Sequence, residues 1–142
     1  MKTIVLVMVF VPLAAITGFG CDMDYSILGP DGITRAISPE RPVRLEAETA
    51  YELVVLFTEE HRNCTLPAED TIFRLNGIDW EQSAPGAGLS LSSEIRWLED
   101  GARSYIARIQ FTSAATGNFE LEVIRDCNKK EGYDETLLFR IT

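Results

Sequence analysis

Residues 104–123 read SYIARIQFTSAATGNFELEV, and this stretch decides the fold class. In the first half, 104–112, alternating positions belong to opposite faces. In the second half the apolar residues Phe119, Leu121 and Val123 alternate with glutamates. A period of two is the repeat of a β-strand. The stretch therefore predicts two strands that follow each other along the chain.

The same short pattern extends over most of the chain. We expect strands at 43–47, 51–57, 71–75, 94–98, 104–112, 119–123 and 137–142, and an irregular first strand at 33–37. The turn signals Asn76-Gly77 and Asp100-Gly101 lie between them. Strands of this length at roughly 8–12 residue spacing predict an all-β, antiparallel sandwich of seven or eight strands. The aromatic residues Trp80, Trp97, Phe73, Phe111 and Phe119 are expected in its core.

The segment SAATGNFELEV, residues 113–123, resembles the corner and penultimate strand of immunoglobulin-like domains. Gly117, Phe119, Leu121 and Val123 occupy the positions of the Gly-x-aromatic-x-apolar pattern, although Phe119 stands where tyrosine is usual. The resemblance implies a Greek-key sandwich, a topology that cupredoxin-like proteins share.

The first 20 residues, MKTIVLVMVFVPLAAITGFG, have the order of a secretory signal: a positive start, an apolar run, and small residues before Cys21. An uncleaved anchor is the alternative, but a spanning helix needs about 20 apolar residues and this run is shorter. We expect 1–20 to be the signal peptide, 21–42 an anchor linker with the irregular first strand, and 43–142 the sandwich domain. The 122 residues after the signal suit one domain.

Three cysteines in an exported chain leave one over. Cys21, in TGFGCD, resembles the lipidated first residue of bacterial lipoproteins, with Gly20 matching their motif and Gly18 standing where leucine is usual. Export favours a disulfide between Cys64 and Cys127. It would close a loop of about 63 residues and stabilise the domain by ~4 kcal/mol in the chain-entropy model.

In an immunoglobulin-like sandwich the loops around 58–67 and 125–135 lie at the same pole. The bridge would then join two adjacent loops that display mixed charge and an aromatic residue. The candidate binding residues there are Glu59, Glu60, His61, Arg62, Arg125, Asp126, Lys129, Lys130 and Tyr133. Loops on a rigid sandwich commonly carry recognition sites, although solvation alone would also make them polar. We therefore expect a non-enzymatic binding module of the cell envelope, lipid-anchored and either periplasmic or on the surface. It would bind a protein or envelope-surface partner without a cofactor.

Other functions find less support in the sequence. The net charge of −9 lacks the basic footprint that nucleic acid or anionic lipid requires, so a lipid anchor is the only membrane contact expected. A cupredoxin-like metal carrier using His61 is the alternative function, but blue copper needs two histidines and the chain has one. Asn63-Cys64-Thr65 fits a glycosylation triplet, and Asp79 with Glu81 could form a catalytic carboxylate pair.

Overall fold

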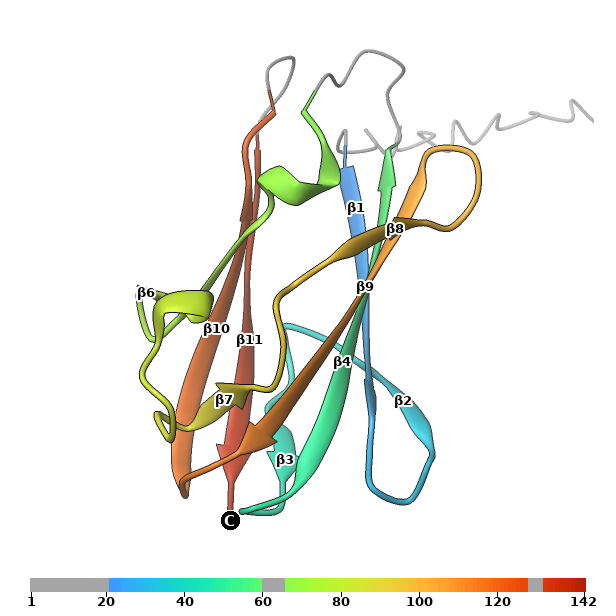
Figure 1. Ribbon diagram of the computed structural model, residues 1–142. Coiled ribbons are helices and arrows are strands. Elements are labelled where there is room, and N and C mark those ends of the chain that lie inside the picture. Colours follow the sequence, from blue (N-terminus) through green and yellow to red (C-terminus); the bar gives the residue numbers. More distant parts are fainter. Residues whose placement is uncertain (1–20, 60–65, 128–131) are drawn as a thin grey trace, which may run out of the picture.

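The computed structural model describes residues 21–59, 66–127 and 132–142, which form two packed β-sheets (Figure 1). The strands are β1 (Cys21–Leu28), β2 (Thr34–Ile37), β3 (Val43–Leu45), β4 (Ala50–Glu59), β5 (Ile72–Leu75), β6 (Ile78–Asp79), β7 (Leu89–Leu91), β8 (Trp97–Glu99), β9 (Ser104–Ser113), β10 (Gly117–Arg125) and β11 (Tyr133–Ile141). Two 3-10 turns, η1 (Ala68–Asp70) and η2 (Trp80–Gln82), interrupt them. The predicted all-β sandwich is confirmed at the level of two packed sheets.

The two sheets differ in their edges. Sheet A has the order β2-β1-β4-β9-β7, with β8 also pairing with β9, and sheet B has the order β3-β11-β10-β5-β6. The pairing of β3 with β11 is parallel, and the other described pairings are antiparallel. Sheet B is therefore mixed at the edge that β3 forms.

Alternation along the long strands builds the core between the sheets. In β4 the side chains of Leu53, Val55 and Phe57 are fully buried, while their neighbours face outward. In β9 and β10 the same alternation buries Ala107, Ile109, Phe111, Leu121 and Val123. Each fully buried large apolar side chain stabilises the fold by about 1.5–3 kcal/mol. Four of the five predicted core aromatics are buried, and Phe119 is partly buried against them.

The amino-terminal part of the domain differs from the prediction. Residues 21–28 were expected in a linker, but they form β1, which pairs with β4 from Cys21↔Glu59 to Leu28↔Glu52. Cys21, Met23, Tyr25 and Ile27 face the core and are buried. The sandwich therefore includes residues 21–28, which the prediction places in a linker.

The described residues form eleven strands, whereas the sequence predicts seven or eight. The extra strands are β1 and short segments such as β6 and β7, of two and three residues. Segments this short cannot show a period of two. The Asn76-Gly77 hairpin prediction is confirmed: both residues have positive φ, 49° and 81°, and they connect β5 to β6.

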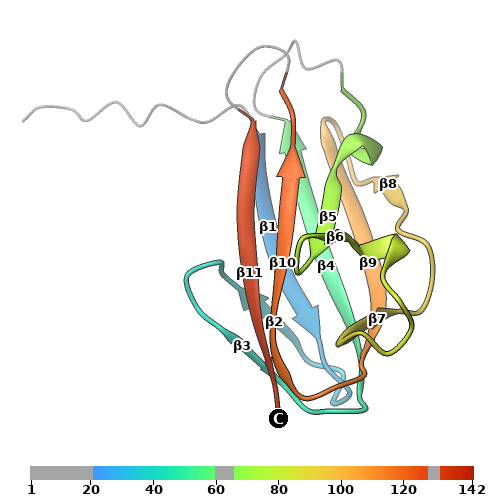
Figure 2. The same cartoon turned by 90° about the vertical axis from the view of Figure 1, so that its left-hand side faces the viewer.

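The two lateral sides of the sandwich differ. We call the side with the edge strands β6 and β7 the closed side and the side with β2 and β3 the open side. At the closed side η2 places Trp80 in the core, 1% exposed, and its indole N–H donates to the Leu89 carbonyl at 2.7 Å. At the other side the edges are β2 and β3, and the chain between them crosses from sheet A to sheet B (Figure 2). This side holds a hollow that residues of both edges line.

Candidate binding cleft

Two ends of the sandwich carry candidate sites. At one end, which we call the cysteine end, β1 begins at Cys21, β4 ends at Glu59 and β10 ends at Arg125 (top of Figure 1). The opposite end carries the turn after β1 and the strand β3. The strands that precede the two predicted loops, β4 and β10, both end at the cysteine end (Figure 1).

Most predicted loop residues fall at places the prediction did not anticipate or outside the described residues. Glu60, His61, Arg62, Cys64, Lys129 and Lys130 lie outside the described residues. Glu59 is the last residue of β4, and Asp126 is exposed just after β10. Arg125 and Tyr133 are strand residues of β10 and β11. Cys127 is partly buried. The Cys64–Cys127 disulfide therefore stays a prediction.

Arg125 is not a solvent-exposed binding residue, because its side chain is 1% exposed. Its Nη1 donates to the Pro67 carbonyl at 2.6 Å, and its Nη2 donates to the Leu66 carbonyl at 2.5 Å. The guanidinium also lies 4.2 Å from the ring centroid of Phe57. A charged group is stable in such a place only when hydrogen bonds replace its hydration. Arg125 therefore fixes the chain at 66–67 against the end of β10.

Tyr133 belongs to a hydrogen-bonded row between the sheets. Its hydroxyl donates to Glu135 Oε2 at 2.7 Å and lies 2.8 Å from the Tyr25 hydroxyl. The Tyr25 hydroxyl also donates to the Met23 sulfur at 3.7 Å. Burial is the main cause that raises the pKa of both tyrosines above the usual value of 10.0. The row is neutral at its tyrosines at physiological pH and serves to join β1 to β11.

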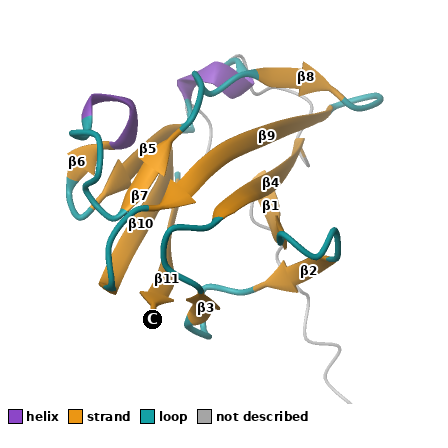
Figure 3. Ribbon diagram, turned by 60° about the horizontal axis from the view of Figure 1, so that its bottom comes forward, coloured by secondary structure: helices purple, strands orange, loops and turns teal. Residues whose placement is uncertain are grey.

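The opposite end contains a cleft of about 810 Å³ between β2 and β3. Residues between 29 and 46 line most of it, and Ile27 and Tyr51 contribute to its wall. Figure 3 shows the loop that connects β2 to β3, the strands that form the edges of the two sheets on this side. Its volume lies in the range of small-ligand sites, roughly 300–1,000 Å³. We call it the 29–46 cleft. The sequence reasoning missed it, because this Pro- and Gly-containing segment was interpreted as a linker.

The wall of the 29–46 cleft is fixed by packing and hydrogen bonds. Ile27 and Leu45 are 4% and 3% exposed and belong to the core. The ring of Tyr51 stacks on Phe111 with 5.9 Å between centroids, and its hydroxyl accepts from the Glu46 amide at 2.9 Å. Side chains held in this way need little reordering when a ligand enters.

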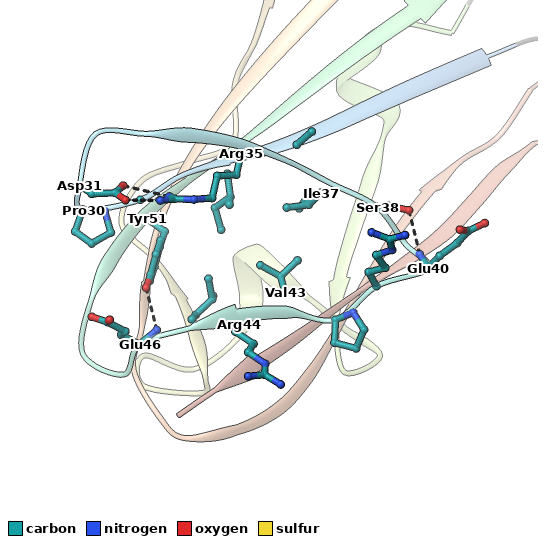
Figure 4. Close-up of a pocket in the computed structure, with 16 residues that line it drawn as sticks. Pro30, Asp31, Arg35, Ile37, Ser38, Glu40, Val43, Arg44, Glu46 and Tyr51 are labelled. Carbon is teal, nitrogen blue, oxygen red and sulfur yellow. Dashed lines mark hydrogen bonds and ion pairs between the residues drawn. The ribbon is translucent and has the colours of Figure 1, made fainter.

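An ion pair spans one side of the cleft (Figure 4). Arg35 donates from Nη1 to Asp31 Oδ1 at 3.2 Å and from Nη2 to Asp31 Oδ2 at 2.5 Å. The Asp31 carboxylate also accepts from the Ile33 amide at 3.1 Å. The hydrogen bond from Arg35 is the main cause that lowers the pKa of Asp31 to about 2. Asp31 is therefore ionised at any physiological pH and neutralises Arg35.

Two further predicted sites can be compared with the structure. Asp79 accepts from the Glu81 amide at 3.0 Å and caps η2, while Glu81 Oε1 accepts from the Ile95 amide at 3.0 Å. Both carboxylates thus hold backbone at the closed side. Among the described residues no three His, Cys, Asp or Glu side chains are arranged to hold a metal ion.

A comparison with known protein families finds no family model that matches the chain, and a search of curated proteins finds no match. Within 21–59, 66–127 and 132–142 there is no helix with the length and apolar character that crossing a membrane requires. The function is therefore argued from the geometry of the cleft and of the cysteine end.

Proposed function

We propose that the protein is a non-enzymatic binding module of the cell envelope, anchored by lipid at Cys21 and binding its ligand in the 29–46 cleft. The observation that carries this proposal is the position of the cleft at the end of β1 opposite to Cys21. Eight strand residues span about 26 Å. An anchored domain would therefore hold the cleft away from the membrane. The cysteine end, favoured by the sequence reasoning for binding, would face the membrane.

The covalent part of the proposal comprises a cleaved signal at 1–20, a lipid on Cys21, and a Cys64–Cys127 disulfide. The hydrogen bond between Arg125 and the Leu66 carbonyl supports the disulfide, because each of these residues is two positions from one of the cysteines. Lipid attachment requires Cys21, which is 8% exposed, to separate from Glu59. The pair Cys21↔Glu59 is the terminal pair of β1, and strand ends open at little free-energy cost.

The finer topology is part of the same proposal. The strand orders of the two sheets are compatible with a Greek-key sandwich, either immunoglobulin-like or cupredoxin-like. Rigid sandwiches of this kind commonly bind ligands with their loops and edges. The partner would be a protein or an envelope-surface component that inserts a group into the 29–46 cleft.

The binding proposal can be tested by site-specific cross-linking in the native membrane. A photoreactive phenylalanine analogue replaces Glu40, which lies at the rim of the cleft and points outward (Figure 4), toward the body of a partner that inserts a group into the cleft. In a control protein the analogue replaces the exposed Arg96 near the closed side. We expect a discrete adduct from position 40 and none from position 96. Equal adducts from both positions, or no adduct from position 40, would refute the proposal.

The anchor can be tested by the intact mass of the mature protein extracted from that membrane. We expect a chain that starts at Cys21, carries a diacylglycerol mass, and lacks two hydrogen atoms because of the disulfide. A mass equal to the unmodified chain from Met1 would refute both the cleavage and the lipid.

A further inference from the structure

The wall of the 29–46 cleft contains a group of apolar side chains among polar ones. Ile27 and Leu45 line the cleft, and Figure 4 shows Ile37, Val43 and Tyr51 around the hollow. All five belong to the core or pack against it, so the apolar wall is continuous with the interior. Covering such a surface with an apolar ligand is favourable by roughly 25 cal/mol for each Å² removed from water.

The charged side chains around this surface differ in whether they face the hollow. Figure 4 shows that Arg44, Glu40 and Glu46 point away from the hollow, while Arg35 and Asp31 neutralise each other along one side. Arg41 also lines the cleft, and within the described residues it has no ion-pair partner within 4.0 Å. The cleft therefore combines an apolar wall with one guanidinium whose charge is not neutralised by a neighbour.

We propose that the 29–46 cleft binds an amphipathic monocarboxylate, with the apolar chain on Ile37, Val43 and Tyr51 and the carboxylate on Arg41. This inference rests on the proposed function and names the ligand class. A guanidinium matches the two oxygens of a carboxylate in a planar, bidentate pair. One available positive charge suits a monoanion. A cationic amphiphile would place its charge against Arg41 without an available acid, since Asp31 is already bound to Arg35.

The test uses three probes with the same eight-carbon chain: octanoate, 1-octanol and octylamine. Each is titrated into the isotope-labelled protein as isolated, with the backbone amide signals of Ile37, Val43 and Leu45 as reporters. Arg41→Gln removes the proposed partner. Arg44→Gln is the matched control. It removes the same charge from the adjoining strand β3, but the side chain of Arg44 points away from the cleft (Figure 4).

We expect octanoate to bind saturably and about 10-fold more tightly than 1-octanol, the ratio that one charge-assisted hydrogen-bonded pair supplies, while octylamine binds more weakly than both. Arg41→Gln should reduce octanoate affinity to that of 1-octanol, and Arg44→Gln should change it less than about twofold. Equal binding of 1-octanol and octanoate would overturn the ligand class while leaving a functional apolar cleft. Equal weakening by the two variants would show only long-range attraction and overturn the role of Arg41. No shift with any probe would overturn the inference, whereas the proposed function is decided separately by the cross-linking at position 40.

Discussion

Gly88 offers the sharpest test of the packing, because the effect of adding one methyl group can be estimated from the structure. Gly88 has φ +90°, and a Cβ there would lie 2.1, 2.5 and 2.6 Å from the Cε1, Cδ1 and Cζ atoms of the Phe119 ring. Gly86, two residues earlier in the same loop, has φ +84° and nothing within 4 Å of its Cβ position. Gly88→Ala and Gly86→Ala therefore differ mainly in the contact with the ring.

Both variants carry the cost of a left-handed backbone conformation, about 1 kcal/mol for alanine. Gly88→Ala must in addition displace the Phe119 ring, which packs against the core, and overpacking of this kind costs roughly 1–3 kcal/mol. We expect Gly86→Ala to lower the free energy of unfolding by about 1 kcal/mol and Gly88→Ala by about 3 kcal/mol.

The measurement is urea unfolding of both variants and the wild-type protein, followed by tryptophan fluorescence under identical redox conditions. The m-values should stay equal, so that the midpoints report stability alone. If the two glycine variants agreed within about 0.5 kcal/mol, the ring contact at Gly88 would carry no energy and the packing argument would be refuted.

Three further predictions use other parts of the molecule. Arg125→Met should lower the free energy of unfolding by about 3 kcal/mol, because two backbone carbonyls lose a charged donor. Arg108→Gln, which breaks an exposed ion pair, should lower it by at most about 0.5 kcal/mol in the same urea titration. Similar losses in the two variants would contradict the difference in burial. Because the pKa of Tyr133 is raised above 10.0, its neutral hydroxyl stabilises the fold below pH 10.0 and this contribution is lost as the pH rises further. Tyr133→Phe should therefore show a smaller alkaline decline of Tm than wild type, and parallel declines would contradict this. Because Arg35 lowers the pKa of Asp31 from 3.8 to about 2, the ion pair stabilises the fold above pH 3.8, and this contribution is lost as the pH falls toward 2. Asp31→Asn should therefore remove that part of the decline of Tm in acid. An unchanged decline would refute the role of the pair.

The strands that the sequence predicted well are those whose two faces differ in polarity. In β9 and β10 the alternation of apolar and polar residues corresponds to burial on one face, as the period of two implies. The hairpin at Asn76-Gly77 was predictable because only a few dipeptides tolerate positive φ at both positions.

Some features had a signal that was not followed far enough. In β10 the buried positions are Leu121, Val123 and then Arg125, so the same alternation places Arg125 on the buried face. In β1 the residues Cys21, Met23, Tyr25 and Ile27 alternate with polar ones. That pattern was overlooked because it directly follows the expected signal peptide and precedes a Pro- and Gly-containing segment.

The 29–46 cleft had no local signal. Its wall depends on the parallel pairing of Val43–Leu45 with Phe139–Ile141, residues almost a hundred positions apart. No short-range pattern specifies which distant strand an edge segment will join. This pairing determines that the side chain of Val43 faces the hollow and that of Arg44 points away from it (Figure 4).

That pairing also sets when the wall of the cleft can form during synthesis. β3 emerges early, but its described hydrogen-bonded strand neighbour, residues 139–141 of β11, emerges nearly a hundred residues later. Contacts this distant in sequence form late, because a long loop must close before they add stability. The wall of the cleft is therefore completed only after the last strand has been synthesised, and under the proposed function a partly made chain could not yet bind its ligand.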